Sequence, residues 1–112
     1  MGATLDTTLA DVLAWQAATF GPQDSASVFT KLRSEVAEVG DAAWTVDHLA
    51  GDPREVLTEC ADVLIMLAGF VAARGFTIAD LRDEVDAKDK INHGRTWRQN
   101  ADGTWSHVKG GE

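Results

Sequence analysis

Hydrophobic residues recur at the three- and four-residue spacing of an amphipathic helix in four segments of the chain. Residues that favour the start or the end of a helix bound these segments. Gly21 and Gly75 follow the first and the third, and Pro53 opens the third. Residues 44–52 interrupt the spacing and are predicted to form a connector with a short turn. The pattern therefore predicts helices over residues 7–19, 26–43, 53–74 and 77–91.

The C-terminal segment has a different pattern. Residues 97–100 and 104–108 flank an Asp102-Gly103 pair, and Asp-Gly between two short stretches is a strong signal for a β-hairpin. Residues 109–112 are expected to be frayed. The predicted fold class is all-α: a single domain over residues 1–112 with four helices packed as a bundle, followed by a short hairpin or irregular tail.

The hydrophobic positions also predict how the helices pack. The third helix is apolar on nearly all sides from Val56 to Val71, which is typical of a helix at the centre of a structure. A domain of this size buries only about two-thirds of its surface, so we expect a core shared within a homodimer or homotetramer. The apolar stripe of the second helix is predicted at Val28, Leu32, Val36, Val39 and Ala43.

Net charge excludes several classes of partner. The chain has 112 residues, of which 10 are basic and 18 acidic, and its formal net charge is −8. This charge argues against a general nucleic-acid binder and against a basic helix on a membrane surface. The longest apolar run, residues 63–73, is much shorter than the ~20 residues of a membrane-spanning helix. Asp6 and Asp11 interrupt the stretch where a signal peptide would be apolar, so we expect a cytoplasmic protein without membrane or nucleic-acid partners.

Four acidic residues occupy positions where carboxylates are costly. Glu35 and Glu38 lie one turn apart beside the apolar stripe of the second helix, and Glu59 and Asp62 interrupt the apolar third helix. Antiparallel packing of these helices would bring the four together, and two carboxylates ~4 Å apart repel by about 4 kcal/mol at an effective dielectric constant of about 20. Mg²⁺ or Mn²⁺ would remove that repulsion, because both prefer oxygen ligands. The alternative is that the first pair belongs to a solvated helix face.

A second polar group follows the end of the fourth helix. Lys88 and Asn92 continue the line of its core positions, and Arg95 and Trp97 come directly after it. Such a group is suited to holding phosphates and stacking on a base. The alternative is that Lys88 and Arg95 offset the negative end of the helix dipole.

These residues together resemble a known family. The segment Lys31-Leu32-Arg33-Ser34-Glu35-Val36-Ala37-Glu38, the segment Glu59-Cys60-Ala61-Asp62, and the spacing of Lys88, Asn92, Arg95 and Trp97 are similar to the MazG-like nucleoside triphosphate pyrophosphohydrolases. Within this all-α superfamily the similarity is to the short dATP/dGTP pyrophosphohydrolases that bacteriophages often carry. It extends over residues 15–105.

The resemblance implies hydrolysis of a deoxynucleoside triphosphate to the monophosphate and pyrophosphate, in control of the nucleotide pool. It implies that Glu35, Glu38, Glu59 and Asp62 hold Mg²⁺, with Mn²⁺ as a substitute, and that Glu35 or Glu38 orients or deprotonates the attacking water. Lys31, Lys88 and Arg95 would neutralise phosphate oxygens, with Asn92 and Trp97 on the nucleotide. Many family members have adjacent glutamates where this chain has Ser34, which leaves open whether one or two ions bind.

Two further classes of function fit the helical pattern. One is a helical oligomer that binds nucleotides or a partner protein without catalysis. The other is an interaction module anchored by its four tryptophans, Trp15, Trp44, Trp97 and Trp105. The intact acidic pairs favour the enzyme, because a simple interaction module has no need to bind Mg²⁺.

Overall fold

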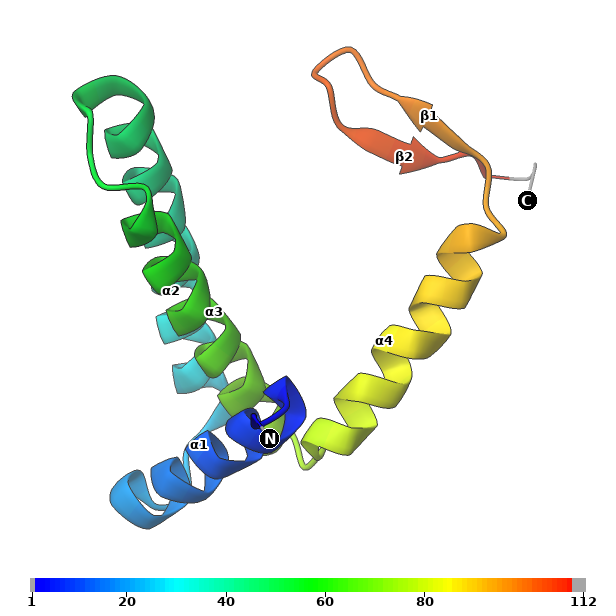
Figure 1. Cartoon of the computed structure of the whole chain (residues 1–112). Coiled ribbons are helices and arrows are strands. Elements are labelled where there is room, and N and C mark those ends of the chain that lie inside the picture. Colours follow the sequence, from blue (N-terminus) through cyan, green and yellow to red (C-terminus); the bar gives the residue numbers. More distant parts are fainter. Residues whose placement is uncertain (1, 110–112) are drawn as a thin grey trace. The chain divides into compact units, whose positions relative to one another are not determined.

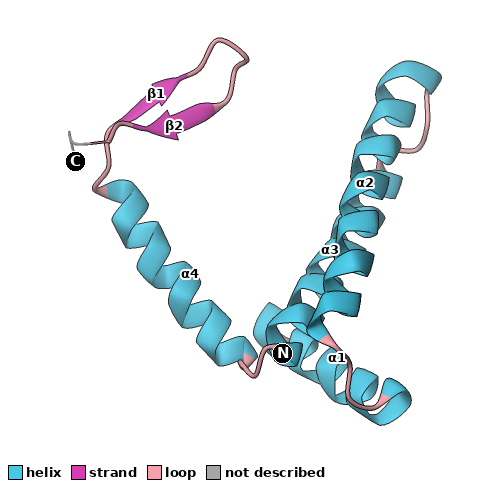
Figure 2. Cartoon of the chain, turned by 180° about the vertical axis from the view of Figure 1, so that it is seen from behind, coloured by secondary structure: helices cyan, strands magenta, loops and turns pink. Residues whose placement is uncertain are grey.

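The computed structural model describes residues 2–109 and contains four helices and one antiparallel hairpin (Figures 1 and 2). The predicted all-α class with a short C-terminal hairpin is confirmed. Of the residues expected to be frayed, Lys109 lies in a turn and 110–112 lie outside the described residues. The elements are α1 (Leu5–Phe20), α2 (Ser25–Leu49), α3 (Arg54–Ala73), α4 (Ile78–His93), β1 (Trp97–Gln99) and β2 (Trp105–His107).

The chain forms two compact units, Met1–Ala79 and Asp80–Glu112. The expected single domain over the whole chain stays a prediction. In the first unit, α2 and α3 pack along each other and α1 packs on α3.

Helices α2 and α3 form an antiparallel hairpin. Phe29, near the start of α2, packs on Phe70, near the end of α3, with ring centroids 5.6 Å apart. Glu35, further along α2, lies close to Glu59, in the first half of α3. From the first contact to the second, the residue number rises on α2 and falls on α3, so the two helices run antiparallel. This pairing brings the two acidic segments of the sequence onto facing helices.

The predicted connector over residues 44–52 is wrong for most of its length, because α2 continues to Leu49. No glycine or proline occurs between Trp44 and Leu49, and local contacts favour helix there. The Trp44 and His48 rings stack with centroids 4.8 Å apart. The helix ends where Ala50 adopts a left-handed conformation (φ 54°) and the Gly51 N–H donates to the Thr45 carbonyl.

Side-chain burial on α2 also differs from the expected stripe. Val28 and Leu32 are buried as predicted, but Val36 is 53% exposed. Glu35 is buried instead, with 8% exposure. Val28, Leu32 and Glu35 follow i, i+4 and i+7 spacing, so the face of α2 that packs on α3 carries a carboxylate on its own stripe.

Aspartates accept backbone hydrogen bonds at the starts of α2 and α3, although the N-cap residue of α3 is Pro53. The Asp24 carboxylate accepts a hydrogen bond from the Ser27 N–H at the start of α2, and Asp52 accepts one from the Arg54 N–H at the start of α3. Gly75, at φ 90°, follows the C-cap residue Arg74 of α3, and its N–H donates to the Ala72 carbonyl.

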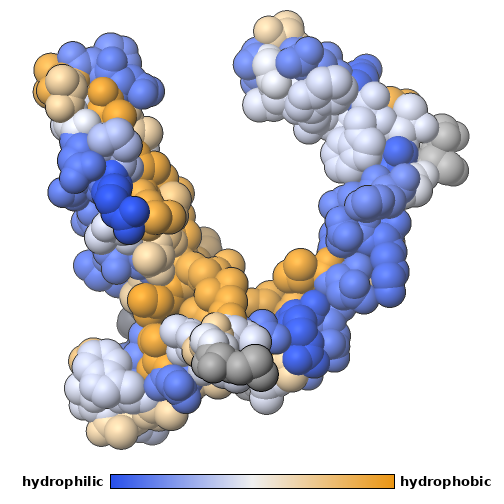
Figure 3. All heavy atoms as spheres, viewed as in Figure 1, coloured by the Kyte–Doolittle hydropathy of each residue, from blue (hydrophilic) through white to orange (hydrophobic). Residues whose placement is uncertain are grey.

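The hydrophobic core of the first unit lies where α1 meets α3. Leu9, Ala68 and Ile78 form a buried cluster, and Leu13 and Leu64 pack against it. Ala68 is fully buried, so a small side chain there lets α1 approach α3 closely. Figure 3 shows further hydrophobic residues gathered along the α2–α3 hairpin.

By length and composition alone, α3 is also apolar enough to cross a membrane, with a mean hydropathy of 1.9. The uninterrupted apolar run of residues 63–73 is too short to predict this. Mostly buried core helices of soluble proteins meet the same criterion, and 6% of this stretch is buried within the described chain. Glu59 and Asp62, in the first half of the helix, distinguish α3 from a uniformly apolar span.

The second unit contains most of α4 and the hairpin. Trp97 pairs with His107 and Gln99 with Trp105 across the two strands. The turn between them depends on Asp102, whose carboxylate accepts hydrogen bonds from the backbone and the hydroxyl of Thr104, and these bonds lower the pKa of Asp102. Gly103 then adopts φ 90°, as the Asp-Gly signal predicts.

We expect Ala68→Leu to lower the free energy of unfolding by about 1–3 kcal/mol, because the site has no room for three more carbon atoms. Urea denaturation followed by circular dichroism measures this change. Ala10→Leu, on the exposed side of α1, is the matched control and should change stability by no more than about 0.5 kcal/mol. Equal stabilities of the two variants would contradict the assignment of Ala68 to the core.

Candidate metal and nucleotide site

Three glutamates converge where α2 faces α3. One carboxylate oxygen from each of Glu35, Glu38 and Glu59 lies within 4.8 Å of the other two. Glu35 and Glu38 share a face of α2 because they are three residues apart, and Glu59 reaches them from the antiparallel α3. Glu35 is buried, Glu59 is half-buried and Glu38 is exposed, so the cluster opens to solvent on the Glu38 side. The predicted convergence is thus observed for three of the four acids.

Lys31 is the cation beside this cluster. Its Nζ lies 3.2 Å from Oε1 of Glu35, one helical turn away on α2. The hydrogen bond to Glu35 and the charge of Glu35 raise the pKa of the Lys31 ammonium. Lys31 therefore stays charged at neutral pH and balances one of the three carboxylates.

The carboxylates that Lys31 does not balance repel one another. A hydrogen bond with Glu35 raises the pKa of Glu38, and the negative charges of Glu35 and Glu59 and partial loss of solvent raise it further. Sharing a proton between Glu35 and Glu38 is the way in which two close carboxylates reduce their repulsion without a cation. A divalent cation would relieve the same repulsion and displace that proton.

Glu59 supplies the observation that best tests whether a metal ion fits. Its Oε2 atom is buried and has no hydrogen-bond partner among the described residues. A buried carboxylate oxygen without a partner is costly, and such groups in native proteins generally have one. A divalent cation between Glu59 and the two α2 glutamates would provide it. The all-oxygen donor set suits Mg²⁺ or Mn²⁺, so these residues fit the metal ion that the resemblance implies.

Asp62, the predicted fourth ligand, is not part of the three-residue cluster. It lies on α3 one turn after Glu59, and its charge contributes to the raised pKa of Lys31, which places it in the neighbourhood. Its role as a ligand stays a prediction.

The second unit brings together three of the predicted nucleotide-binding residues. Arg95 Nη1 donates to Oδ1 of Asn92 over 3.2 Å, and the Trp97 indole N–H donates to the Asn92 carbonyl over 2.9 Å. Lys88 and Asn92 line a shallow hollow on α4. Asn92 therefore organises the guanidinium and the indole into one group. The glutamates belong to the first unit, and that this group meets phosphates held there stays a prediction.

Sequence reasoning missed a hollow beside Lys31. Its volume is about 410 Å³, and it is lined by Gln16, Phe20, Gln23, Asp24, Ser27, Val28, Lys31, Met66 and Gly69. One signal could have found it: Leu9, Leu13, Gln16 and Phe20 follow i, i+4, i+7 and i+11 spacing on α1. A polar amide on the core stripe of a helix is unfavourable unless it has a partner, so Gln16 indicates a candidate binding site in the same way as the acids of α2 and α3.

Comparison with known proteins identifies a structural relative. No known family profile matches the chain, and no curated protein sequence matches it. Among solved structures, the chain is similar to a cyanophage S-2L MazG-like pyrophosphohydrolase bound to dGDP and three catalytic Mn²⁺ ions per active site. The TM-score is 0.72 and the identity 26%, over 99% of this chain and 98% of that one. The resemblance read from the sequence is confirmed, and the chain has the MazG-like fold over its full length.

The metal-free protein should show an elevated pKa for Glu38 in a carbon-13 NMR titration of its side-chain carboxyl. Glu35→Gln should lower that pKa, because the carboxylate neighbour becomes a neutral amide that donates a hydrogen bond. Mg²⁺ should move the titration of the unsubstituted protein to lower pH, since cation and proton compete for the same oxygens. An ordinary glutamate pKa that is insensitive to both changes would contradict the proposed geometry.

Proposed function

We propose that this chain, which has the MazG-like fold, is a metal-dependent nucleoside triphosphate pyrophosphohydrolase. It cleaves the bond between the α- and β-phosphates of a deoxynucleoside triphosphate, with dATP and dGTP as the expected substrates. The products are the monophosphate and pyrophosphate. The observation that carries this proposal is the glutamate cluster with its unpartnered Glu59 oxygen, found within this fold.

Glu35, Glu38 and Glu59 would hold the divalent cation, with Asp62 as the fourth carboxylate. Bound Mg²⁺ or Mn²⁺ would supply charge neutralisation for the triphosphate and lower the pKa of a coordinated water. We assign to Glu38 the orientation of the attacking water and acceptance of its proton. Glu38 is exposed to the solvent side of the cluster, whereas Glu35 is buried and paired with Lys31. Lys31 would then face the phosphate oxygens, together with Lys88 and Arg95.

The exposed hydrophobic residues of the first unit support a homodimer or a homotetramer. Leu57 on α3 is 59% exposed, and Phe29 and Val36 on α2 are exposed as well. A second copy would cover these residues and complete the shared core that the sequence predicts. We prefer this to insertion of α3 into a membrane, because Glu59 and Asp62 would then lie in hydrocarbon. The proposed setting is the cytoplasm of a bacterium or of a phage-infected host.

Pyrophosphate release from the four dNTPs, with Mg²⁺, with Mn²⁺ and with EDTA, tests the activity. We expect metal-dependent release, and a loss of about 100-fold or more in Glu38→Gln and in Glu59→Gln at saturating Mg²⁺. Asp47→Asn, an exposed position on α2, is the control and should keep the full rate. Nucleotide and Mg²⁺ binding without release from any substrate would instead favour the non-catalytic nucleotide binder.

Light scattering at micromolar concentration should give two or four times the 12.0 kDa of one chain. Leu57→Asp should shift the protein towards the monomer while its circular dichroism stays helical, because a charge in a buried contact is costly. A monodisperse monomer for the unsubstituted chain would rule out the oligomer. Co-sedimentation with phosphatidylcholine vesicles would point to the membrane alternative.

A further inference from the structure

We infer that the hollow beside Lys31 binds the base of a purine nucleotide, and that the side-chain amides of Gln16 and Gln23 select that base. The inference rests on the proposed function, because it takes the phosphates of the same nucleotide to lie at the glutamate cluster. It adds to that function the part of the molecule that distinguishes one nucleotide from another.

The position of the hollow follows from Lys31. Lys31 belongs to its wall and also lies 3.2 Å from Glu35 of the cluster. From Lys31 the wall continues along α2 through Ser27 to Asp24. Seven residues of helix correspond to about 10 Å, which is comparable with the length of a nucleoside. A nucleotide with its phosphates at the glutamates thus has space for its sugar and base along this part of α2.

The size and lining of the hollow suit an aromatic base. Its volume of about 410 Å³ lies within the usual range for small-molecule sites. Phe20 lines the hollow and is 56% exposed, and its ring makes an edge-on contact with Trp15 at a centroid distance of 5.5 Å. Met66, opposite on α3, is an adaptable apolar side chain. An aromatic ring and a thioether on the walls favour a flat, polarisable ligand.

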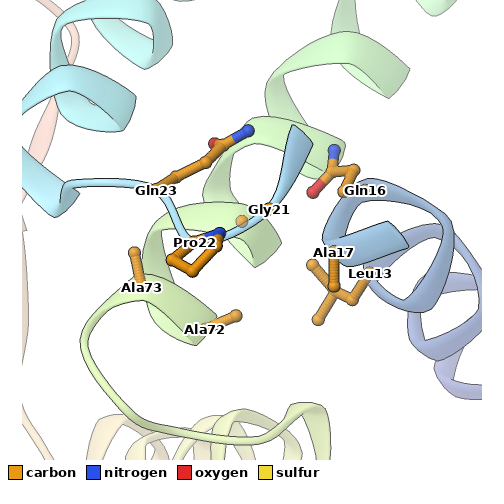
Figure 4. A pocket seen from close by; sticks show the side chains of 9 residues that line it. Leu13, Gln16, Ala17, Gly21, Pro22, Gln23, Ala72 and Ala73 are labelled. Carbon is orange, nitrogen blue, oxygen red and sulfur yellow. The ribbon is translucent and has the colours of Figure 1, made fainter. Parts of the chain in front are cut away.

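Two amides supply the polar recognition. Gln16 comes from α1 and Gln23 from the connection between α1 and α2, and both line this hollow and a neighbouring one of about 300 Å³. Figure 4 shows the neighbouring hollow, where both amides lie on the side away from Ala72 and Ala73. Within the described part of the chain, neither amide hydrogen-bonds to another residue. Each can donate and accept at once, which is how glutamine pairs with the edge of a purine.

Gly69 provides an independent reason to assign a role to Gln16. A Cβ atom on Gly69 would lie 3.3 Å from Oε1 of Gln16 and 3.9 Å from Cγ1 of Val28. Glycine in the middle of a helix is less favourable than alanine, so its presence in α3 needs a local cause. A Cβ here would require Oε1 of Gln16 to move by a few tenths of an ångström, so the glycine lets this amide lie directly against α3, where both residues line the hollow.

The test compares Gln16→Met and Gly69→Ala with the unsubstituted protein, using KM and kcat for the four dNTPs with Mn²⁺. We expect Gln16→Met to raise KM for the preferred purine dNTP by about 10-fold and to reduce its preference over dCTP and dTTP. Gly69→Ala favours the helix and shifts the Gln16 amide by a few tenths of an ångström, so it should reduce the same preference, to a smaller extent than Gln16→Met, in a well-folded protein. Gly40→Ala is the matched control, because its Cβ would meet nothing within 4 Å.

Two probes separate this inference from the proposed function. Mn²⁺ binding by calorimetry and inhibition by inorganic tripolyphosphate, which has no base, should be unchanged in Gln16→Met. Unchanged purine preference in both variants of an active enzyme would overturn the base site and leave the proposed activity intact. If the unsubstituted protein hydrolyses no dNTP, calorimetry with dADP and dGDP in the presence of Mn²⁺ decides the matter. Weakening of that binding by Gln16→Met would support the base site, and equal binding or none would overturn it.

Discussion

Repulsion between carboxylates at the contact of two packed helices is the constraint on which this structure depends. Glu35 lies on the same stripe of α2 as Val28 and Leu32, so pairing of α2 with α3 buries it against Glu59. Replacing either glutamate by an apolar residue would remove the repulsion and improve the packing. The chain instead keeps both: Lys31 pairs with Glu35 on one side, and on the other side the neighbouring negative charges raise the pKa of Glu38. This arrangement is costly for a structural helix pair and appropriate for a cation site.

The remaining features of the first unit are arranged around that contact. α1 approaches α3 through the fully buried Ala68, and Gly69, the next residue, leaves space for Gln16. Two adjacent small residues on α3 therefore serve different purposes, one for the core and one for the hollow beside Lys31. The glutamate cluster and the hollow share the α2–α3 hairpin as their support, so their separation is set by helix geometry rather than by loops.

Much of this could be predicted from the sequence, because the signals were local. Helical spacing, the Asp-Gly pair and Gly75 gave the four helices and the hairpin, and the acidic pairs predicted the cluster. The predicted end of α2 was wrong. A weak hydrophobic pattern over residues 44–49 does not end a helix when the segment contains no glycine or proline. Glu35 is buried in place of Val36 because the buried face of α2 is rotated by one residue from the predicted stripe. Only the packing of α2 against α3 determines which of two adjacent faces is buried. The hollow was missed because its walls come from α1, α2 and α3 together, and the one local signal, Gln16 on the core stripe of α1, does not show which other segments complete it.

The pairing of Lys31 with Glu35 also affects the net charge of the site, both without a metal ion and after one or two ions bind. When all of its carboxylates are ionised, the three glutamates and the Lys31 ammonium sum to −2, or to −3 with Asp62, in a chain whose net charge is −8. Without metal, such a site repels a triphosphate. One divalent ion brings the sum to zero, or to −1 with Asp62, and a second ion would make it positive in either case. Free divalent cation would then act as a condition for substrate entry as well as for chemistry, and nucleotide turnover would follow the cation supply of its surroundings.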